Sequence, residues 1–178
     1  MRLKRGYVHI YTGKGKGKTT ASLGIGVRGA LNGLRVCMFQ FLKKKGSSAE
    51  NRLKFPNFKV LCFDEIHPMF SCQGSGFRVQ DKLRRRIAED LKKVKKAIES
   101  RQYDMVILDE IVNCVSEGFL DEGEVLDLLQ SRPRSVEVIL TGRGATNKMK
   151  AAADYVTQLT ESKHPFNKGV LPRKGIEF

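Results

Sequence analysis

The chain has 178 residues and carries 33 lysines and arginines against 19 aspartates and glutamates, a net charge of +14. Apolar residues make up 40% and charged residues 29%, which fits a globular chain of one domain that is large enough to bury a core. No apolar run is long enough to cross a membrane, no secretory segment follows the basic N-terminus, and the four cysteines form no Cys-x-x-Cys pair, so we expect a cytoplasmic protein.

The first predicted strand, 7–11, leads into a basic, glycine-rich loop, and a helix is predicted from 18 to 31. The loop reads Thr12-Gly13-Lys14-Gly15-Lys16-Gly17-Lys18-Thr19-Thr20. Glycines let successive backbone N–H groups surround a polyphosphate, and a helix N-terminus adds positive potential. We therefore predict a phosphate-binding loop in which Lys18 contacts phosphate oxygens and Thr19 binds Mg²⁺ (or Mn²⁺). The usual pattern begins with Gly, where this chain has Thr12. The alternative is a basic surface turn.

The middle of the chain is predicted to contain two strands, 36–41 and 58–63, and one long helix, 77–100. Apolar positions in this helix step by three or four residues and form one stripe, made of Val79, Leu83, Ile87, Leu91, Val94 and Ile98. The other faces carry a dense set of lysines and arginines. We interpret them as a solvated surface, with an anion- or RNA-binding face as the alternative.

The next predicted strand, 105–108, is apolar and ends directly in two carboxylates, Asp109 and Glu110. In phosphate-loop proteins, an acid at the end of a strand beside the first one faces the metal ion held by the loop hydroxyl. A divalent ion that bridges phosphates prefers hard oxygen ligands of this kind. We therefore expect Thr19, Asp109 and Glu110 to form a metal site, the alternative being a strand that merely ends in surface acids.

The remaining predicted elements are a helix over 121–130 with Asp121 as its N-cap, a strand over 136–140, a helix over 145–154 and a strand over 155–159. Strands that alternate with helices favour an α/β fold with a mainly parallel sheet flanked by helices. We expect a three-layer, P-loop NTPase-like (RecA-like) architecture. Residues 1–178 are predicted to form a single nucleotide-binding domain whose tail, about 162–178, is irregular.

Several motifs outside the loop resemble one particular family. They are Gln40-Phe41-Leu42-Lys43, Thr141-Gly142-Arg143, Ala153-Asp154-Tyr155-Val156-Thr157, Lys163-His164-Pro165-Phe166-Asn167-Lys168-Gly169 and Gly175-Ile176-Glu177-Phe178. Together with the loop, which shares the family's Thr at its first position, they are similar to the P-loop corrinoid (cob(I)alamin or cob(I)yrinic acid a,c-diamide) adenosyltransferases. The likeness covers most of residues 6–43 and 103–178.

The resemblance implies a transferase that moves the 5′-deoxyadenosyl group of ATP to the Co(I) of a reduced corrinoid and releases triphosphate. It assigns the nucleotide loop to Gly13, Lys14, Gly15, Lys16, Gly17, Lys18, Thr19 and Thr20. Lys18, Thr19 and Glu110 are the expected catalytic residues. Thr19 and Glu110 are the preferred metal ligands, and Asp109 is the next candidate. Arg28 is either a nucleotide ligand or an ordinary helix-surface arginine. Asn113 either lines the site or is a polar residue that opens a helix.

The corrinoid side of the predicted site carries a weaker signal, because the chain has no Trp where family members place an aromatic segment. Phe70, with Met69 beside it, is either the apolar wedge against the corrinoid or a packing residue. A homodimer is expected by analogy with the family. The alternatives are a P-loop ATPase that binds nucleic acid, which the net charge of +14 favours, and a non-catalytic ATP- or corrinoid-binding protein. Aromatics that would stack on bases are sparse in the basic stretches, so nucleic acid is the less favoured partner.

Overall fold

The computed structural model describes residues 2–65 and 77–176, and its centre is a sheet of six strands in the order β3-β2-β4-β5-β1-β6. The strands are β1 (Val8–Thr12), β2 (Val36–Gln40), β3 (Phe58–Cys62), β4 (Met105–Asp109), β5 (Glu137–Thr141) and β6 (Tyr155–Gln158). Every pairing between them is parallel. Each predicted strand is present with its ends shifted by no more than one residue, and the predicted α/β class is confirmed.

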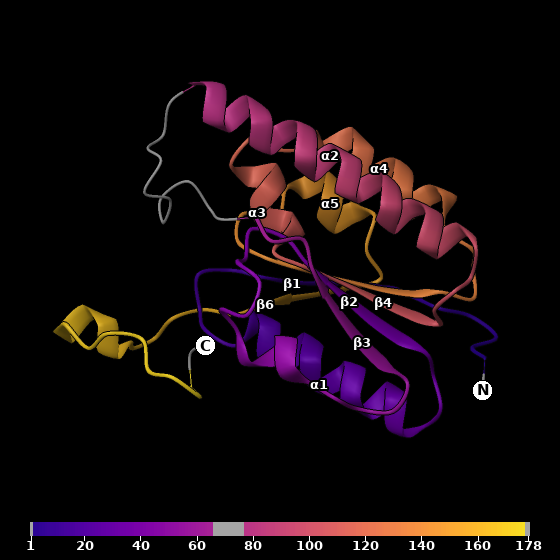
Figure 1. Cartoon of the computed structure of the whole chain (residues 1–178), viewed down its shortest axis with the longest axis horizontal. Helices are drawn as coiled ribbons and strands as arrows, with labels where there is room; N and C mark the ends of the chain where they lie inside the picture. The colour runs from indigo at the N-terminus through magenta and orange to yellow at the C-terminus, as the bar shows by residue number, and fades with distance from the viewer. Residues whose placement is uncertain (1, 66–76, 177–178) are drawn as a thin grey trace.

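The helices lie on both faces of this sheet, as parallel crossover connections require. They are α1 (Lys18–Leu31), α2 (Phe77–Glu99), α3 (Ile111–Ser116), α4 (Glu122–Ser131) and α5 (Asn147–Ala151), with short 3-10 turns η1 (Ala49–Arg52) and η3 (Pro165–Lys168). Figure 1 shows α1 below the sheet and the other helices above it. The architecture therefore has three layers.

Two hydrophobic clusters fill the spaces between the layers. All residues of β2 and β4 are buried, as expected for strands covered on both sides. The predicted stripe of α2 faces one cluster, with Leu83, Ile87, Leu91, Val94 and Ile98 all buried. Its lysines and arginines lie mostly at the surface, so the periodicity of the sequence identified the packed face of this helix.

Two elements differ from the expectation. The helix predicted over 145–154 is confined to Asn147–Ala151, because Thr146 caps its start at the N–H of Met149 and Asp154 is drawn into the sheet by the N–H of Val8. The short helix α3 was not predicted. It follows β4 after a turn at Glu110, whose φ of 67° is in the left-handed region. The predicted cap at Asp121 is confirmed by its hydrogen bond from the N–H of Gly123.

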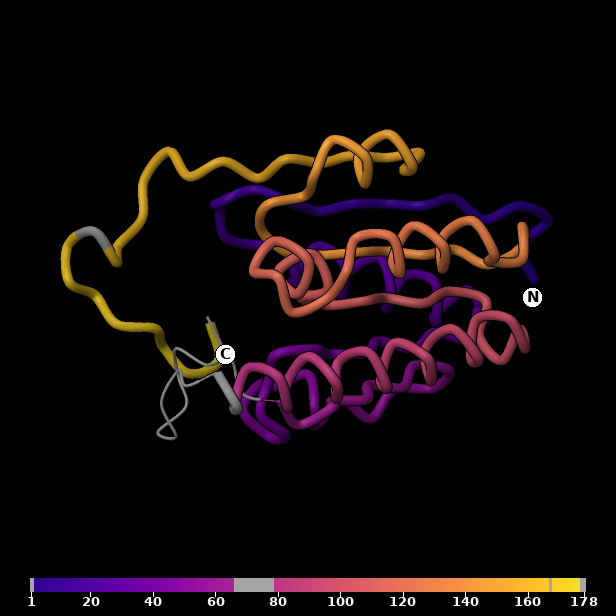
Figure 2. Tube along the Cα trace, turned by 90° about the horizontal axis from the view of Figure 1, so that it is seen from above, coloured from indigo at the N-terminus to yellow at the C-terminus, as the bar shows by residue number. Residues whose placement is uncertain are grey.

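The last part of the described chain is the least packed. All four residues of the edge strand β6 are exposed. Beyond them the tail is irregular apart from η3 and, as Figures 1 and 2 show, loops outward past the carboxyl ends of the strands. Since every strand joins one sheet, the arrangement supports a single domain over 1–178, which stays a prediction. None of the helices in the described ranges is both long and apolar enough to span a membrane.

Candidate functional site

The loop between β1 and α1 is held from behind by the chain that follows β6. The N–H of Gly15 donates to the carbonyl of Leu159 over 2.9 Å, and the N–H of Leu159 donates to the carbonyl of Thr12 over 2.8 Å. A β-carbon on Gly13 would lie 2.2 Å from the carbonyl oxygen of Leu159, and one on Gly15 would lie 2.7 Å from that of Thr160. The glycines are therefore required by this close approach as well as by the curvature of the loop.

The surroundings of the first loop position explain why it carries a threonine instead of the usual glycine. Thr12 is buried, with 3% of its surface exposed. Its hydroxyl accepts a hydrogen bond from the N–H of Ala145 over 3.3 Å, at the connection between β5 and α5. The side chain thus ties the loop to the neighbouring strand end, a role that glycine cannot fill.

Lys18 begins α1 and turns its amino group back over the loop. Its Nζ donates to the carbonyls of Gly13 and Gly15 over 2.8 and 2.7 Å. Burial, and then the positive charge of Arg143, lower the pKa of Lys18 from its ordinary value. The ammonium group therefore lies at the mouth of the loop, with Arg143 as a second cation near it.

Asp109 is the centre of the polar network at the end of β4. It is fully buried, and its Oδ1 accepts hydrogen bonds from the hydroxyls of Thr19 over 2.9 Å and Thr141 over 2.7 Å. Its Oδ2 accepts from Lys43 Nζ over 2.5 Å and from Gln40 Nε2 over 3.3 Å. The carboxylate is thus held by donors from α1, β2, β5 and the turn after β2.

Glu110 has a different environment from its neighbour. Its N–H donates to the hydroxyl of Thr141 over 3.0 Å, which fixes the backbone at the left-handed turn before α3. Burial, and then the charge of Asp109, raise the pKa of Glu110, while Lys43, Lys18 and Arg143 act in the opposite direction. The charges of Lys18, Lys43 and Arg143 therefore all act on its carboxyl group.

The donors gathered here suit a hard divalent ion bound together with phosphates. A hydroxyl has one proton and two lone pairs. The hydroxyl of Thr19 donates a hydrogen bond to Asp109, so its lone pairs are available for a cation. The described residues contain no cluster of three or more His, Cys, Asp or Glu side chains that would hold a metal by themselves. An ion at this edge would need the Thr19 hydroxyl and ligand oxygens besides the carboxylates, as Mg²⁺ with a nucleotide does.

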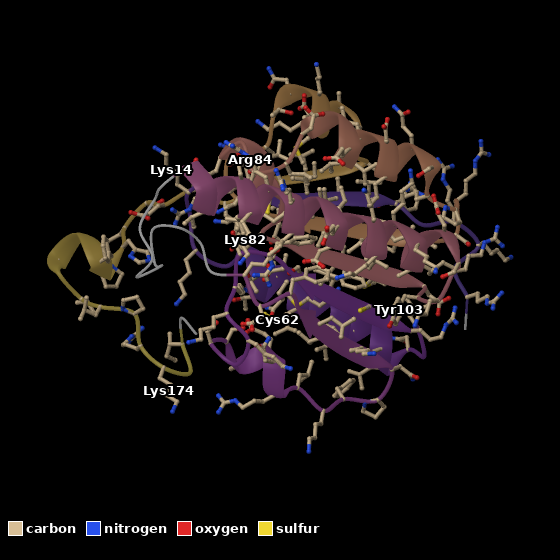
Figure 3. All side chains as sticks on the ribbon, turned by 45° about the horizontal axis from the view of Figure 1, so that its top comes forward. Lys14, Cys62, Lys82, Arg84, Tyr103 and Lys174 are labelled. Carbon is tan, nitrogen blue, oxygen red and sulfur yellow. The ribbon has the colours of Figure 1, made fainter. Side chains whose placement is uncertain are left out.

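The structure brings most of the predicted residues together at the carboxyl edge of the sheet. Gly13, Gly15, Gly17, Lys18 and Thr19 form the loop and the start of α1, and Asp109 and Glu110 face them. Lys14, Lys16 and Thr20 are exposed around the loop. Figure 3 shows Lys14 on the same side of the molecule as Cys62 at the end of β3, whereas Tyr103, before β4, lies at the other end of the sheet.

The remaining predicted residues are Asn113 and Arg28, together with Phe70 and its neighbour Met69. Asn113 lies in the first turn of α3 and uses its Oδ1 to accept the N–H of Arg143 over 2.5 Å, so it shapes the turn after β5. Arg28 is exposed in the last turn of α1, roughly 15 Å further along the helix axis than Lys18, and does not join this cluster. Phe70 and Met69 lie outside the described residues.

Sequence reasoning did not assign Gln40, Lys43 and Thr141 to the site. All of them stand at or just after the end of a predicted strand, and in a parallel sheet these ends share one edge. That position was a usable signal. What the sequence lacked was the lateral order of the strands, which places β4 between β2 and β5.

Comparison with known proteins gives a consistent result. The model of a family described as "ATP:corrinoid adenosyltransferase BtuR/CobO/CobP" matches residues 4–178. A corrinoid adenosyltransferase of Sinorhizobium sp is 33% identical over 180 residues, which cover 98% of this chain and 81% of the relative. Those of Pseudomonas aeruginosa and Escherichia coli strain K12 are each 32% identical, covering 99% and 98% of this chain and 86% and 87% of the relatives.

Solved structures confirm the fold alone, since their sequences are distant. The KaiC-like protein PH0186 of Pyrococcus horikoshii OT3 has a TM-score of 0.58 and 14% identity, covering 89% of this chain and 73% of that chain. The flagellar accessory protein FlaH of Methanocaldococcus jannaschii has a TM-score of 0.56 and 12% identity, covering 88% and 72%. The predicted three-layer, P-loop NTPase-like architecture is thereby confirmed.

Proposed function

Since the chain belongs to the family of ATP:corrinoid adenosyltransferases, it transfers the 5′-deoxyadenosyl group of ATP to a reduced corrinoid, and we propose that the loop between β1 and α1 holds the triphosphate that leaves. The observation that carries the proposal is the juxtaposition of this loop with Thr19 and Asp109, joined by a hydrogen bond of 2.9 Å. The nucleophile is the Co(I) of the substrate, which attacks C5′ of the ribose.

The residues around the loop match the needs of this reaction. The cobalt–carbon bond forms as the bond from C5′ to the α-phosphate oxygen breaks, and the triphosphate leaves with the bonding electrons. Its growing charge is stabilised by backbone N–H groups of the loop and by the ammonium of Lys18. Arg143 adds positive charge near Lys18. The nucleophile carries no proton, so the reaction requires no general base.

We assign the metal site to Thr19 and Glu110, with Asp109 behind Thr19. A bound Mg²⁺ (or Mn²⁺) would neutralise charge on the triphosphate oxygens. Thr19 would contribute its lone pairs, because its hydroxyl proton is engaged in the hydrogen bond to Asp109. Glu110 would contribute a carboxylate oxygen, and its raised pKa is consistent with an acid that gains from a nearby cation. This division of roles is supported by the different hydrogen-bonding environments of the two acids.

The corrinoid side of the site keeps the sequence-based proposal. Phe70 remains our candidate for the apolar wedge against the corrinoid. A Phe70→Ala variant should then bind ATP normally and require more corrinoid for half-maximal transfer. Equal corrinoid dependence in the variant and the parent protein would remove Phe70 from this role.

One experiment separates this reaction from the competing ones. The protein is incubated with ATP, Mg²⁺ and chemically reduced cobalamin, and the products are followed by phosphorus NMR and by the absorbance of the light-sensitive adenosylated corrinoid. Triphosphate formed in step with the adenosylated product is the expected result. Orthophosphate release stimulated by RNA or DNA would instead support the ATPase that the basic face of α2 suggests. Binding of ATP with no product would support a sensor or carrier.

We also propose that the protein is a cytoplasmic homodimer. A reducing compartment is supported by Cys37, Cys62 and Cys114, which are free thiols. Dimerisation is supported by exposed apolar side chains on and beyond β6, including Tyr155 and Val156. Sedimentation equilibrium should give twice the chain mass, and Val156→Lys should shift the protein toward the monomer. Leu31→Lys, at an exposed leucine on α1, is the matched control.

A further inference from the structure

We propose that Lys43 is a positioning residue for the metal-binding hydroxyl of Thr19, because it holds one oxygen of Asp109 so that the other oxygen faces Thr19. The inference rests on the proposed function of the loop, and it gives a role to Lys43, a residue of the Gln40-Phe41-Leu42-Lys43 motif that had none.

The backbone after β2 is built to turn Lys43 back toward β4. Phe41 continues the sheet through the hydrogen bond of its N–H to the carbonyl of Asp109, over 3.0 Å. Leu42, a buried non-glycine residue, then adopts a left-handed conformation with φ of 52°. Such a conformation persists only where the surrounding structure enforces it, and it is frequent at functional sites. The turn therefore has a structural reason, which is the direction it gives to the next side chain.

The main chain of Lys43 is anchored at the same point. Its carbonyl accepts the N–H of Glu65 over 3.0 Å and the thiol of Cys62 over 3.2 Å. Both partners lie at or just beyond the end of β3. The backbone of Lys43 is thus held between two strand ends. From there its side chain extends across the end of β2 to Asp109.

Lys43 is the cation that compensates the buried Asp109 directly. The two side chains are 20% and 0% exposed and their Nζ and Oδ2 atoms are 2.5 Å apart. The other donors to Asp109, namely Thr19, Thr141 and Gln40, are neutral. The amino group of Lys18 donates its hydrogen bonds to the loop carbonyls of Gly13 and Gly15.

The two oxygens of Asp109 have different partners, and this links the charge of Lys43 to the orientation of Thr19. With Oδ2 held by Lys43, Oδ1 is left for the hydroxyl of Thr19. The proton of that hydroxyl then points to Asp109 and its lone pairs point away. Loss of a partner behind a metal ligand typically weakens metal binding by about 10- to 100-fold. Lys43 should therefore change the affinity for the metal ion without contacting the nucleotide.

The test compares Lys43→Met with Lys44→Met, which removes the same charge from an exposed neighbour. ATP binding is measured by titration calorimetry in EDTA and over a series of Mg²⁺ concentrations, with circular dichroism as a check on folding. For Lys43→Met we expect metal-free affinity within about twofold of the parent, and a Mg²⁺ requirement raised about tenfold. Lys44→Met should match the parent, and Lys43→Arg should recover most of the Mg²⁺ response.

Each other outcome overturns the inference. An equal loss of ATP affinity with and without Mg²⁺ would mean that Lys43 contacts the nucleotide itself. A Mg²⁺ requirement like that of Lys44→Met would mean that Asp109 needs no cation from Lys43. If Lys43→Met does not fold, Lys43→Gln, which keeps a donor to Asp109 but not the charge, is judged by the same criteria. If the parent protein shows no Mg²⁺ response at all, the proposed metal site fails first and this inference fails with it.

Discussion

The hydroxyl of Thr19 donates a hydrogen bond to Asp109 over 2.9 Å, which joins the first turn of α1 to the carboxyl end of β4. This contact orients the small polar side chain that we propose as a metal ligand. It also connects the phosphate loop to the strand whose acids were expected to serve the metal.

Substitution of Thr19 should therefore separate the hydroxyl from the shape of the side chain. Thr19→Val keeps the volume and loses the hydroxyl, so the Mg²⁺ needed for half-maximal ATP binding should rise about tenfold or more. Thr19→Ser keeps the hydroxyl and should stay within about threefold of the parent. Calorimetric titration at several Mg²⁺ concentrations measures both. Equal behaviour of the valine and serine variants would contradict the assignment.

Removal of the loop lysine should weaken the nucleotide complex. Lys18→Ala deletes the charged donor that we propose binds phosphate oxygens, a contact worth about 1.5–3 kcal/mol, so ATP affinity should fall roughly 10- to 100-fold. The adenosyl transfer should slow as well, because the leaving group loses the same cation. Lys59→Ala, at an exposed position on β3, is the control for the change in net charge. Unchanged turnover in Lys18→Ala would exclude the loop from the mechanism.

The close approach of Leu159 to the loop predicts a large difference between two glycines. Gly13→Ala places a β-carbon 2.2 Å from a carbonyl oxygen at φ of 102°, so the free energy of unfolding should fall by about 2 kcal/mol or more. Gly24→Ala, in α1 with no atom within 4 Å of the new carbon, should raise it by about 0.5–1 kcal/mol. Urea unfolding of both variants measures the difference. Similar values would mean that the loop is not held against Leu159.

The stability of the protein should decrease as the pH rises through the neutral range, because of Glu65. Burial, and then the charge of Asp90, raise the pKa of Glu65 from 4.5 to about 8, while Arg86 and Lys93 act against this. Among the described residues no donor reaches its carboxylate oxygens, and the nearby charge of Asp90 favours the protonated form of Glu65. The folded state then binds this proton more tightly than the unfolded state does, and the stabilisation is lost between the two pKa values.

We expect the loss to amount to roughly 2 kcal/mol or more between about pH 5 and about pH 8. Glu65→Gln, whose amide can donate to Asp90 at any pH, should flatten this dependence and be the more stable protein above about pH 8. Urea unfolding across this range gives the measurement, with Glu99→Gln on the exposed end of α2 as the control. A parent protein whose stability rises with pH over the same range would contradict the prediction.

The local features of this protein could be read along the chain. A loop of alternating lysines and glycines between an apolar strand and a helix has one main physical use, and the apolar stripe of α2 is set by helical periodicity. Thr19 and Asp109 were therefore assigned to the loop and to the end of β4. The expectation that β4 lies directly beside β1 was wrong, because β5 lies between them. Each of these assignments depends on residues that are close together in the sequence, and residue propensities and spacing describe such local features well.

The surroundings of Asp109 depended on contacts between distant segments. Lys43 and Thr141 reach it because β4 lies between β2 and β5, and no local pattern states which strands are neighbours. The backing of the loop by Leu159 and the bond from Arg143 to Asn113 arise in the same way. Lateral strand order follows from the global packing of helices on the two faces of the sheet, so the partners that tune each site residue emerged only when the whole chain was assembled.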